Sequence, residues 1–163
     1  MKKSEKSKTI RAIMVVVFGL VLVSVAFAAT QYFNPNDYYT ADVIRIDGTA
    51  TVVTGTGCRG LVADTTEERA NSIRLGLEGK IEERPNSHDI YVQTLKNFNI
   101  TIESATIESY DDSYYYSNLI LKREDKVVKM DSKPSDAIAI ALRAAAPIYI
   151  KKELLDKEGK SIC

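Results

Sequence analysis

The segment of residues 131–150 constrains the fold more than any other part of the chain. It begins as a polar turn, continues as a short apolar helix that starts at Pro134, and ends in a strand that starts at Pro147. Proline suits the first turn of a helix, where a missing N–H costs little. The helical period assigns the buried face of this helix to four apolar residues, Ile138, Ala141, Leu142 and Ala145.

Polar side chains gather where this helix begins. Ser132 or Ser135 can accept a hydrogen bond from the free amides of the first turn. Asp131 and Asp136 lie at the positive end of the helix, where negative charge is favoured. By itself, this pattern is typical of a well-capped, buried helix.

The N-terminal region predicts a membrane anchor. Residues 1–11 carry five basic residues and one acidic residue, and residues 12–29 carry no charge. A helix needs about 20 mainly apolar residues to span a bilayer, and basic flanking residues stay in the cytoplasm. We therefore expect a cytoplasmic tail, a single transmembrane helix and an extracytoplasmic domain. The alternative is a signal peptide cleaved at the small-x-small pattern Ala26-Phe27-Ala28, which would secrete the domain.

The remainder divides into a linker at 30–40, one domain at 41–155 and a flexible tail at 156–163. Without anchor and linker the chain retains about 120 residues, enough for a single hydrophobic core. The whole chain holds 22 basic and 22 acidic residues, but beyond residue 11 there are 17 basic and 21 acidic residues. This mildly acidic composition argues against a tight, non-specific nucleic-acid binder.

Hydrophobic periodicity and turn residues predict an α+β domain after the transmembrane helix, with a mostly antiparallel or mixed sheet and three short helices. The strands are expected at 41–54 with a break at Asp47-Gly48, and at 58–63, 100–110, 114–123, 126–130 and 148–150. The helices are expected at 65–79, at 87–98 and from Pro134 onward, with a short helical end near 151–155.

Capping residues mark the first two helices. Thr65 and Glu68 have the spacing of a capping box, and Gly79 ends the first helix. Ser87 is expected to cap the second helix. The apolar positions of that second helix are Ile90, Val92, Leu95 and Phe98.

Two cysteines, Cys58 and Cys163, lie at opposite ends of the domain. They form no CxxC pair, and with a single histidine there is no cluster of zinc ligands. A disulfide between them is permitted outside the cytoplasm. We expect both thiols to be unpaired, with Cys163 on a mobile tail.

Two blocks of the sequence resemble the signature of the bifunctional nuclease family of bacteria, archaea and plants. One block runs from Lys133-Pro134-Ser135-Asp136 through an apolar stretch to Arg143 and on to residues 146–150. The other block is Leu77-Glu78-Gly79 followed by Arg84-Pro85-Asn86-Ser87-His88-Asp89-Ile90. The resemblance covers about residues 43–155. It implies a membrane-anchored nuclease that hydrolyses phosphodiester bonds of RNA or DNA, with assistance from a divalent metal cation.

The resemblance also singles out site residues. His88-Asp89 stands where the family has His-Asp, and a histidine near neutral pKa can act as general base or metal ligand. We expect four catalytic residues, His88, Asp89, Asp131 and Asp136. We expect Lys133, Ser135 and Arg84 to bind substrate, and Glu78, Asp131 and Asp136 to hold the cation through oxygen ligands. The alternative for each is a local role, as a helix cap or surface charge.

The chain departs from the family pattern at two positions. Lys133 replaces an arginine before the proline, which keeps the charge and loses the bidentate fork. Arg69 stands where relatives place a glutamate in a Glu-Ala-x-x-Ile pattern. These changes support a second hypothesis, a non-catalytic binding or assembly module on the same fold, with nucleic acid, the membrane or a second copy of the chain as partner.

Overall fold

The structure is a computed structural model that describes residues 34–163. The predicted tail at 1–11, the predicted span at 12–29 and the start of the linker lie outside the described residues. The part of the chain from Pro35 to Cys163 forms one unit. Among the helices of residues 34–163, none has the length and apolar character needed to cross a membrane.

A mixed sheet of eight strands organises this unit, in the order β6-β5-β4-β7-β1-β2-β3-β8. β7 pairs in parallel with β4, and the other neighbours pair in antiparallel fashion. The predicted α+β class with a mostly antiparallel sheet is thus confirmed. The strands are β1 (Tyr38–Asp47), β2 (Ala50–Thr56), β3 (Arg59–Asp64), β4 (Thr101–Tyr110), β5 (Tyr115–Arg123), β6 (Lys126–Ser132), β7 (Ile148–Lys151) and β8 (Lys160–Ser161).

The strand predictions hold in both halves of the sheet. β1 and β2 form the hairpin expected at Asp47-Gly48, and Gly48 has the positive φ of 58° that such a tight turn requires. β4, β5 and β6 form the predicted meander. β1 begins at Tyr38, inside the residues assigned to the linker, because it pairs there with β7.

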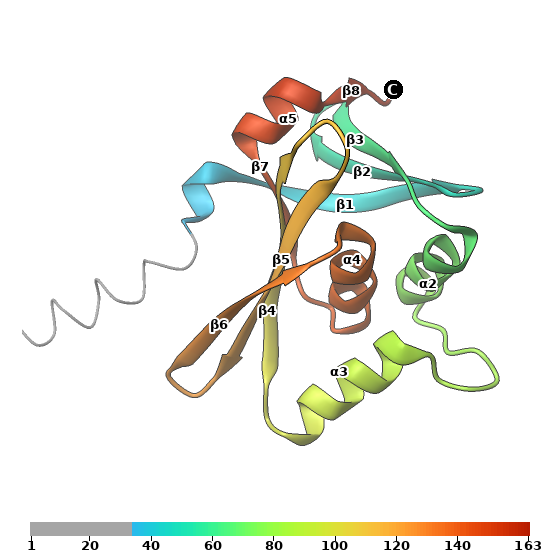
Figure 1. The fold of residues 1–163 in the computed structure, drawn as a ribbon, viewed down its shortest axis with the longest axis vertical. Coiled ribbons are helices and arrows are strands. Elements are labelled where there is room, and N and C mark those ends of the chain that lie inside the picture. The colour runs from blue at the N-terminus through green and yellow to red at the C-terminus, as the bar shows by residue number, and fades with distance from the viewer. Residues whose placement is uncertain (1–33) are drawn as a thin grey trace, which may run out of the picture. The chain divides into compact units, whose positions relative to one another are not determined.

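Four α-helices accompany the sheet in residues 34–163, one more than predicted, together with a short 3₁₀ helix, η1 (Pro35–Asp37). They are α2 (Glu67–Glu78), α3 (Ser87–Asn97), α4 (Pro134–Arg143) and α5 (Lys152–Glu158). Figure 1 shows α4 between the long strands β4 and β5 and the helices α2 and α3, and α4 packs against all four. The predicted helical end near 151–155 is a full helix, α5.

α4 is the centre of the core. Five consecutive residues, Ala137 to Ala141, are buried, because elements cover this helix on several sides. Ile138 and Ala141 are therefore buried as predicted. The prediction is wrong for Leu142, which is half-buried, and for Ala145, which is exposed. Ala145 lies beyond the end of the helix with a left-handed φ of 52°.

The helix starts differ from the predicted caps by one residue. α2 is capped by Thr66, whose hydroxyl accepts from the amide of Arg69, and ends at Gly79 as predicted, with φ of 64°. α3 is capped by Asn86 rather than Ser87, because the Asn86 carboxamide oxygen reaches two amides of the first turn. Its exposed apolar residues, Ile90 and Phe98, show that only part of its predicted apolar face meets the core.

Neither serine caps α4. Lys133 is the N-cap and makes no side-chain cap bond. The Ser132 hydroxyl donates to the carbonyl of Lys133, and the Ser135 hydroxyl donates to the carboxylate of Asp136. Pro134 removes one of the amides that a cap would satisfy, which lessens the need for a side-chain cap.

The C-terminal residues are held to the sheet in place of the predicted flexible tail at 156–163. β8 pairs with β3, and the amide of Ile162 donates to the carbonyl of Cys58 at 2.9 Å. This pairing brings Cys163 beside Cys58, with 5.3 Å between Cα atoms, and the two form a disulfide. The prediction of two unpaired thiols is therefore wrong. Arg59 adds hydrogen bonds to the carbonyls of Leu155 and Asp156.

Candidate active site

The starts of α3 and α4 meet beside the middle of α2. His88 lies in the first turn of α3, Asp136 in the first turn of α4, and Ser72 on the buried side of α2. The His88 Nδ1 atom lies 2.7 Å from Ser72 Oγ, and its Nε2 atom lies 3.5 Å from Asp136 Oδ1. The two sequence motifs, more than forty residues apart, thus share one site.

The hydrogen bonds around Ser72 determine the tautomer of His88. Asn86 Oδ1 accepts from two backbone amides, so the other end of this carboxamide is the NH₂ group, which donates to Ser72 Oγ at 3.4 Å. Arg143 Nη2 also donates to Ser72 Oγ, at 3.2 Å. A hydroxyl oxygen accepts two bonds, so the remaining Ser72 O–H donates to His88 Nδ1. Neutral His88 therefore carries its proton on Nε2, directed at Asp136.

Of the three side chains Ser72, His88 and Asp136, that of Asp136 is the most open to solvent. Its side chain is 34% exposed, whereas that of His88 is 16% exposed. The 3.5 Å separation is long for a hydrogen bond, and such contacts often tighten when a substrate binds. Ser72, His88 and Asp136 therefore form a line from the interior to the surface, with a carboxylate at its outer end.

Asp89 lies beside these three residues, but both of its carboxylate oxygens already accept hydrogen bonds. Its Oδ1 accepts from Arg143 Nε at 2.6 Å, and its Oδ2 accepts from the amide of Asn86 at 2.8 Å. The side chains of Asp89 and Arg143 are each 7% exposed. Burial raises the pKa of Asp89, but the hydrogen bonds from Arg143 and Asn86 outweigh it and leave the pKa below its ordinary value. Asp89 thus remains an anion that holds Arg143.

Arg143 joins the three helices. Besides Asp89 on α3, its guanidinium donates to the Ser72 carbonyl on α2 at 2.8 Å and to the Ala139 carbonyl on α4 at 2.9 Å. A planar guanidinium with several fixed donors suits this role. The position of His88 relative to Asp136 therefore depends on the Asp89–Arg143 pair.

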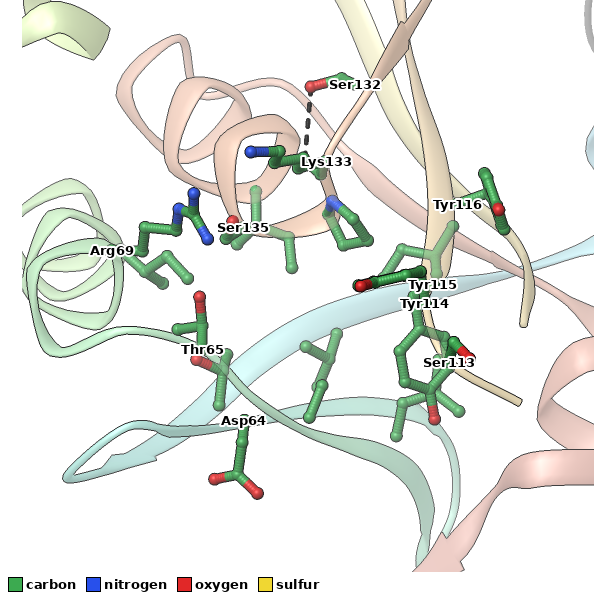
Figure 2. Close-up of a pocket in the computed structure, with 18 of the residues that line it drawn as sticks. Asp64, Thr65, Arg69, Ser113, Tyr114, Tyr115, Tyr116, Ser132, Lys133 and Ser135 are labelled. Atoms are coloured by element: carbon green, nitrogen blue, oxygen red, sulfur yellow. Dashed lines mark hydrogen bonds between the residues drawn. The ribbon is translucent and has the colours of Figure 1, made fainter. Parts of the chain in front are cut away.

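Two hollows open on this region. A small pocket of about 280 Å³ lies over His88 and Asp136, with Glu68, Arg69 and Glu82 among its other lining residues. A larger cavity of about 440 Å³ lies between the β2–β3 hairpin, the start of α4 and the turn before β5. Arg69 lines both hollows. In Figure 2, Arg69 stands on one side of the larger cavity, opposite Tyr114 and Tyr115.

The other predicted site residues fall into two groups. Asp131, Lys133 and Ser135 line the larger cavity, and Ser135 also bonds to Asp136. Arg84 is exposed in the loop before α3 and lines neither hollow. Glu78 is exposed at the end of α2 and pairs with Lys80 at 2.8 Å, which lowers the pKa of Glu78.

The predicted cation ligands do not come together. Glu78 is paired with Lys80, Asp131 lines the larger cavity, and Asp136 faces His88. Within residues 34–163, no three side chains of the acidic, histidine and cysteine types are grouped so that they could hold a metal ion. These residues therefore do not fit a metal centre built from protein ligands alone.

Several residues of the site carry no signal in the sequence. Ser72 contacts His88 only because the fold brings α2 beside it, which its position in the chain does not reveal. Arg143 ends the block that begins at Lys133, but nothing in that block shows that it bonds to Asp89 and Ser72. Tyr114 and Tyr115 line the cavity from a turn whose sequence predicts only a strand boundary. Asn86, by contrast, lies within the Pro-Asn-Ser-His-Asp block and could be found there.

Comparison with known proteins places the chain in a family. The model of the bifunctional nuclease domain matches residues 63–162, and the chain belongs to that family. An uncharacterized protein of Mycobacterium tuberculosis is 29% identical over 93 residues, which are 57% of this chain and 55% of that protein. Bifunctional nuclease 1 of Oryza sativa subsp. japonica and the bifunctional nuclease of Oryza minuta are each 27% identical over 82 residues, 48% of this chain and 25% of theirs. The chain thus spans about half the length of its mycobacterial relative and a quarter of the rice proteins.

Proposed function

We propose that this chain is a nuclease that hydrolyses phosphodiester bonds of RNA or DNA at Asp136 and His88. The observation that carries the proposal is the arrangement of three side chains: Ser72 Oγ is hydrogen-bonded to His88 Nδ1, and His88 Nε2 lies 3.5 Å from the carboxylate of Asp136. Membership of the bifunctional nuclease domain family and the names of the rice relatives support the choice of substrate.

The proposed mechanism uses Asp136 as general base. Its carboxylate takes a proton from water, and the water oxygen attacks the phosphorus. The ester bond to the leaving oxygen breaks as that oxygen takes a proton from bulk water, and Asp136 then releases its proton to solvent. His88 directs Nε2–H at the carboxylate and holds it in place, so His88 is a positioning residue. Arg69, which lines the same pocket, supplies positive charge to the phosphoryl oxygens as negative charge builds up on them.

We propose that a divalent cation would bind only together with the substrate, whose phosphate would supply some of its ligands. Mg²⁺ is commonly held by one or two carboxylates plus substrate phosphates. Asp136 is the carboxylate of the pocket that faces His88, and it would be a protein ligand in such an arrangement, with Glu68 and Glu82 as the other carboxylates that line the pocket. The mechanism above contains no metal step, and the dependence of cleavage on added cation is part of its test.

We also propose that the domain is extracytoplasmic, anchored in the cell membrane by a single span at residues 12–29 or secreted after cleavage of that segment. The charge-free run behind a basic tail supports export. The Cys58–Cys163 disulfide supports it independently, because disulfides persist in oxidising compartments. Protease added to intact spheroplasts should digest the domain. Full protection would contradict this location.

The test of the activity is cleavage of labelled RNA and single-stranded DNA by the full chain in mild detergent, with Mg²⁺ or with EDTA. His88→Ala should lower the rate by about 100-fold, the usual cost of misplacing a catalytic group by about 1 Å. His88→Gln should retain part of the rate, because a glutamine N–H can replace the Nε2–H that holds Asp136. Asp125→Asn, on the β5–β6 turn, is the matched control. Equal rates for His88→Ala and wild type would refute the proposal.

The second candidate is a non-catalytic binding or assembly module, which Arg69 favours because it replaces the glutamate of the family pattern. In this case the full chain would bind nucleic acid, or form a homo-oligomer measurable by light scattering, without cleaving any substrate. Binding that persists in His88→Ala while neither form cleaves would favour this candidate.

A further inference from the structure

We propose that the larger cavity binds one unpaired nucleotide of a single-stranded nucleic acid, with the base inside against Tyr114 and Tyr115 and the phosphate at the rim between Arg69 and Lys133. The choice of nucleic acid as ligand rests on the function proposed above. The lining of the cavity combines aromatic and apolar side chains with two cations, Arg69 and Lys133, and therefore suits a planar ring that carries a negatively charged group. Its volume of about 440 Å³ lies in the range of small-ligand pockets.

An unpartnered hydroxyl marks the interior of the cavity. Thr51, on β2, lines the cavity and is 4% exposed. Its Oγ1 is buried and has no hydrogen-bond partner within residues 34–163. A buried hydroxyl without a partner is costly and uncommon. The oxygen itself is shielded from solvent. A rotation of the Thr51 side chain would bring the hydroxyl to the cavity, where a polar atom on the edge of a base would satisfy it. Val53, Leu61 and Ile138 would contact the ring.

Tyrosines form one wall. Tyr115 is half-buried, and Tyr110 packs against its ring with centroids 4.5 Å apart, which fixes the ring in place. Tyr114 is 72% exposed, yet its backbone is held by Asp111, whose carboxylate accepts from the amides of Ser113 and Tyr114 at 3.1 and 2.8 Å. Burial raises the pKa of Tyr115, so its phenol stays neutral. Aromatic side chains held in this way are suited to stacking with an unpaired base.

Two cations stand at the rim with unused donors. In the described part of the chain, the side chains of Arg69 and Lys133 make no hydrogen bond or ion pair. Figure 2 shows Arg69 directed toward the cavity, which Lys133 and Ser135 also line. Pro134 begins α4 at the same rim, and the start of a helix attracts phosphate.

The acidic residues that line the cavity do not neutralise the positive charge of Arg69 and Lys133. Figure 2 shows the carboxylate of Asp64 pointing away from the cavity, and it accepts from the hydroxyl of Thr49. Asp131 is exposed on β6. Because Arg69 also lines the pocket over His88 and Asp136, a phosphate held by Arg69 would lie beside the proposed general base.

A binding assay with a chain that should not cleave tests the nucleotide site without measuring cleavage. The probe is a fluorescein-labelled dT 12-mer, compared with the same strand in duplex with dA, and the readout is anisotropy with the full chain carrying His88→Ala. We expect tighter binding of the single strand than of the duplex, since a paired base cannot enter the cavity. Arg69→Glu, which restores the family residue, should weaken binding at least 10-fold. It should also reduce the salt slope by about 0.7 for one lost phosphate contact.

Two variants test the interior. Thr51→Val removes the hydroxyl at nearly constant volume, and it should weaken binding about 5- to 10-fold while leaving the unfolding midpoint unchanged or higher. Tyr114→Ala should weaken binding about 10-fold through lost stacking. Arg123→Glu, with the same charge change on the β5–β6 turn, and Phe98→Ala, an exposed aromatic residue at the end of α3, are the matched controls.

The outcomes distinguish this inference from the proposed nuclease. Cavity variants that weaken binding, in a chain that cleaves nothing, would support the cavity and reject the nuclease. Cleavage that depends on His88, with binding indifferent to Arg69→Glu, Thr51→Val and Tyr114→Ala, would overturn the cavity and keep the nuclease. No measurable binding of the single strand, or equal binding of the duplex, would also overturn the inference.

Discussion

Replacement of Asp89 by asparagine tests whether this residue supports the site or performs the chemistry. Asparagine keeps the shape of the side chain and an acceptor for Arg143 but removes the negative charge. Loss of one partner of a buried ion pair costs about 3–5 kcal/mol, because the other charge remains buried and uncompensated. Arg143 retains bonds to two carbonyls and to the Ser72 hydroxyl, so we expect the lower end of this range, about 3 kcal/mol.

The assay is urea unfolding of the full chain in mild detergent, followed by tyrosine fluorescence, since the chain has nine tyrosines and no tryptophan. Asp47→Asn is the matched control. It breaks the Arg45–Asp47 pair, whose side chains are 61% and 75% exposed, and should cost less than about 1 kcal/mol. A double variant that replaces Asp89 and Arg143 with leucine should be more stable than Asp89→Asn, because no buried charge remains.

The pH dependence provides a second readout of the same pair. The folded pKa of Asp89 lies below its ordinary value, so the unfolded chain binds the proton more tightly. The stabilisation from this carboxylate is therefore complete above the unfolded pKa, about 4, and is lost as the pH falls through the folded pKa. Asp89→Asn should lose less stability than wild type below about pH 4. A cost under about 1 kcal/mol at pH 7 would refute the structural role and leave Asp89 free for catalysis.

Three further predictions concern stability, each read as a change in urea midpoint. Cys58→Ser opens a loop that spans 105 residues and should cost about 2–5 kcal/mol, so an unchanged midpoint would show that the disulfide does not form. Ile138→Ala should cost about 2–5 kcal/mol, and Leu142→Ala clearly less because Leu142 is only half-buried; the reverse order would contradict the packing of α4. Gly79→Ala should cost about 1 kcal/mol or more, because alanine is strained at φ of 64°, and a neutral result would contradict that helix end.

The elements that the sequence predicts correctly are those with local causes. The hairpin at Asp47-Gly48 and the end of α2 at Gly79 follow from backbone conformations that glycine favours. The meander of β4, β5 and β6 follows from apolar alternation between polar turns. Pro134 marks the start of α4 for the same kind of reason, a fixed φ and a missing donor.

The features that the sequence does not predict depend on packing between distant elements. The apolar face of α4 is misjudged for two reasons. The helix ends at Arg143, so Ala145 lies beyond it. Elements also cover the helix on several sides, so its period does not separate buried from exposed residues. The disulfide requires the pairing of β8 with β3, a contact between strands a hundred residues apart. The cap of α3 is misplaced because asparagine and serine are both good caps and stand side by side.

In the candidate site, too, the sequence predicts the features with local causes and misses the contacts between distant elements. The motifs place His88 and Asp136 at two helix starts, and the structure brings these two together. They do not reveal that Asp89 is bound to Arg143, or that Ser72 fixes the tautomer of His88, since both contacts cross between helices. Asp131 lies at the larger cavity instead, because β6 ends there before the chain turns into α4.

The rate of cleavage by Asp136→Asn shows whether Asp136 is the base that activates water. Asparagine keeps the size of the side chain and can still contact His88, but it cannot accept a proton from water. With labelled single-stranded RNA in excess over the full chain, we predict a rate at least 100-fold below wild type, with unchanged binding of the strand and an unchanged unfolding midpoint. A rate within threefold of wild type would show that Asp136 is not the general base.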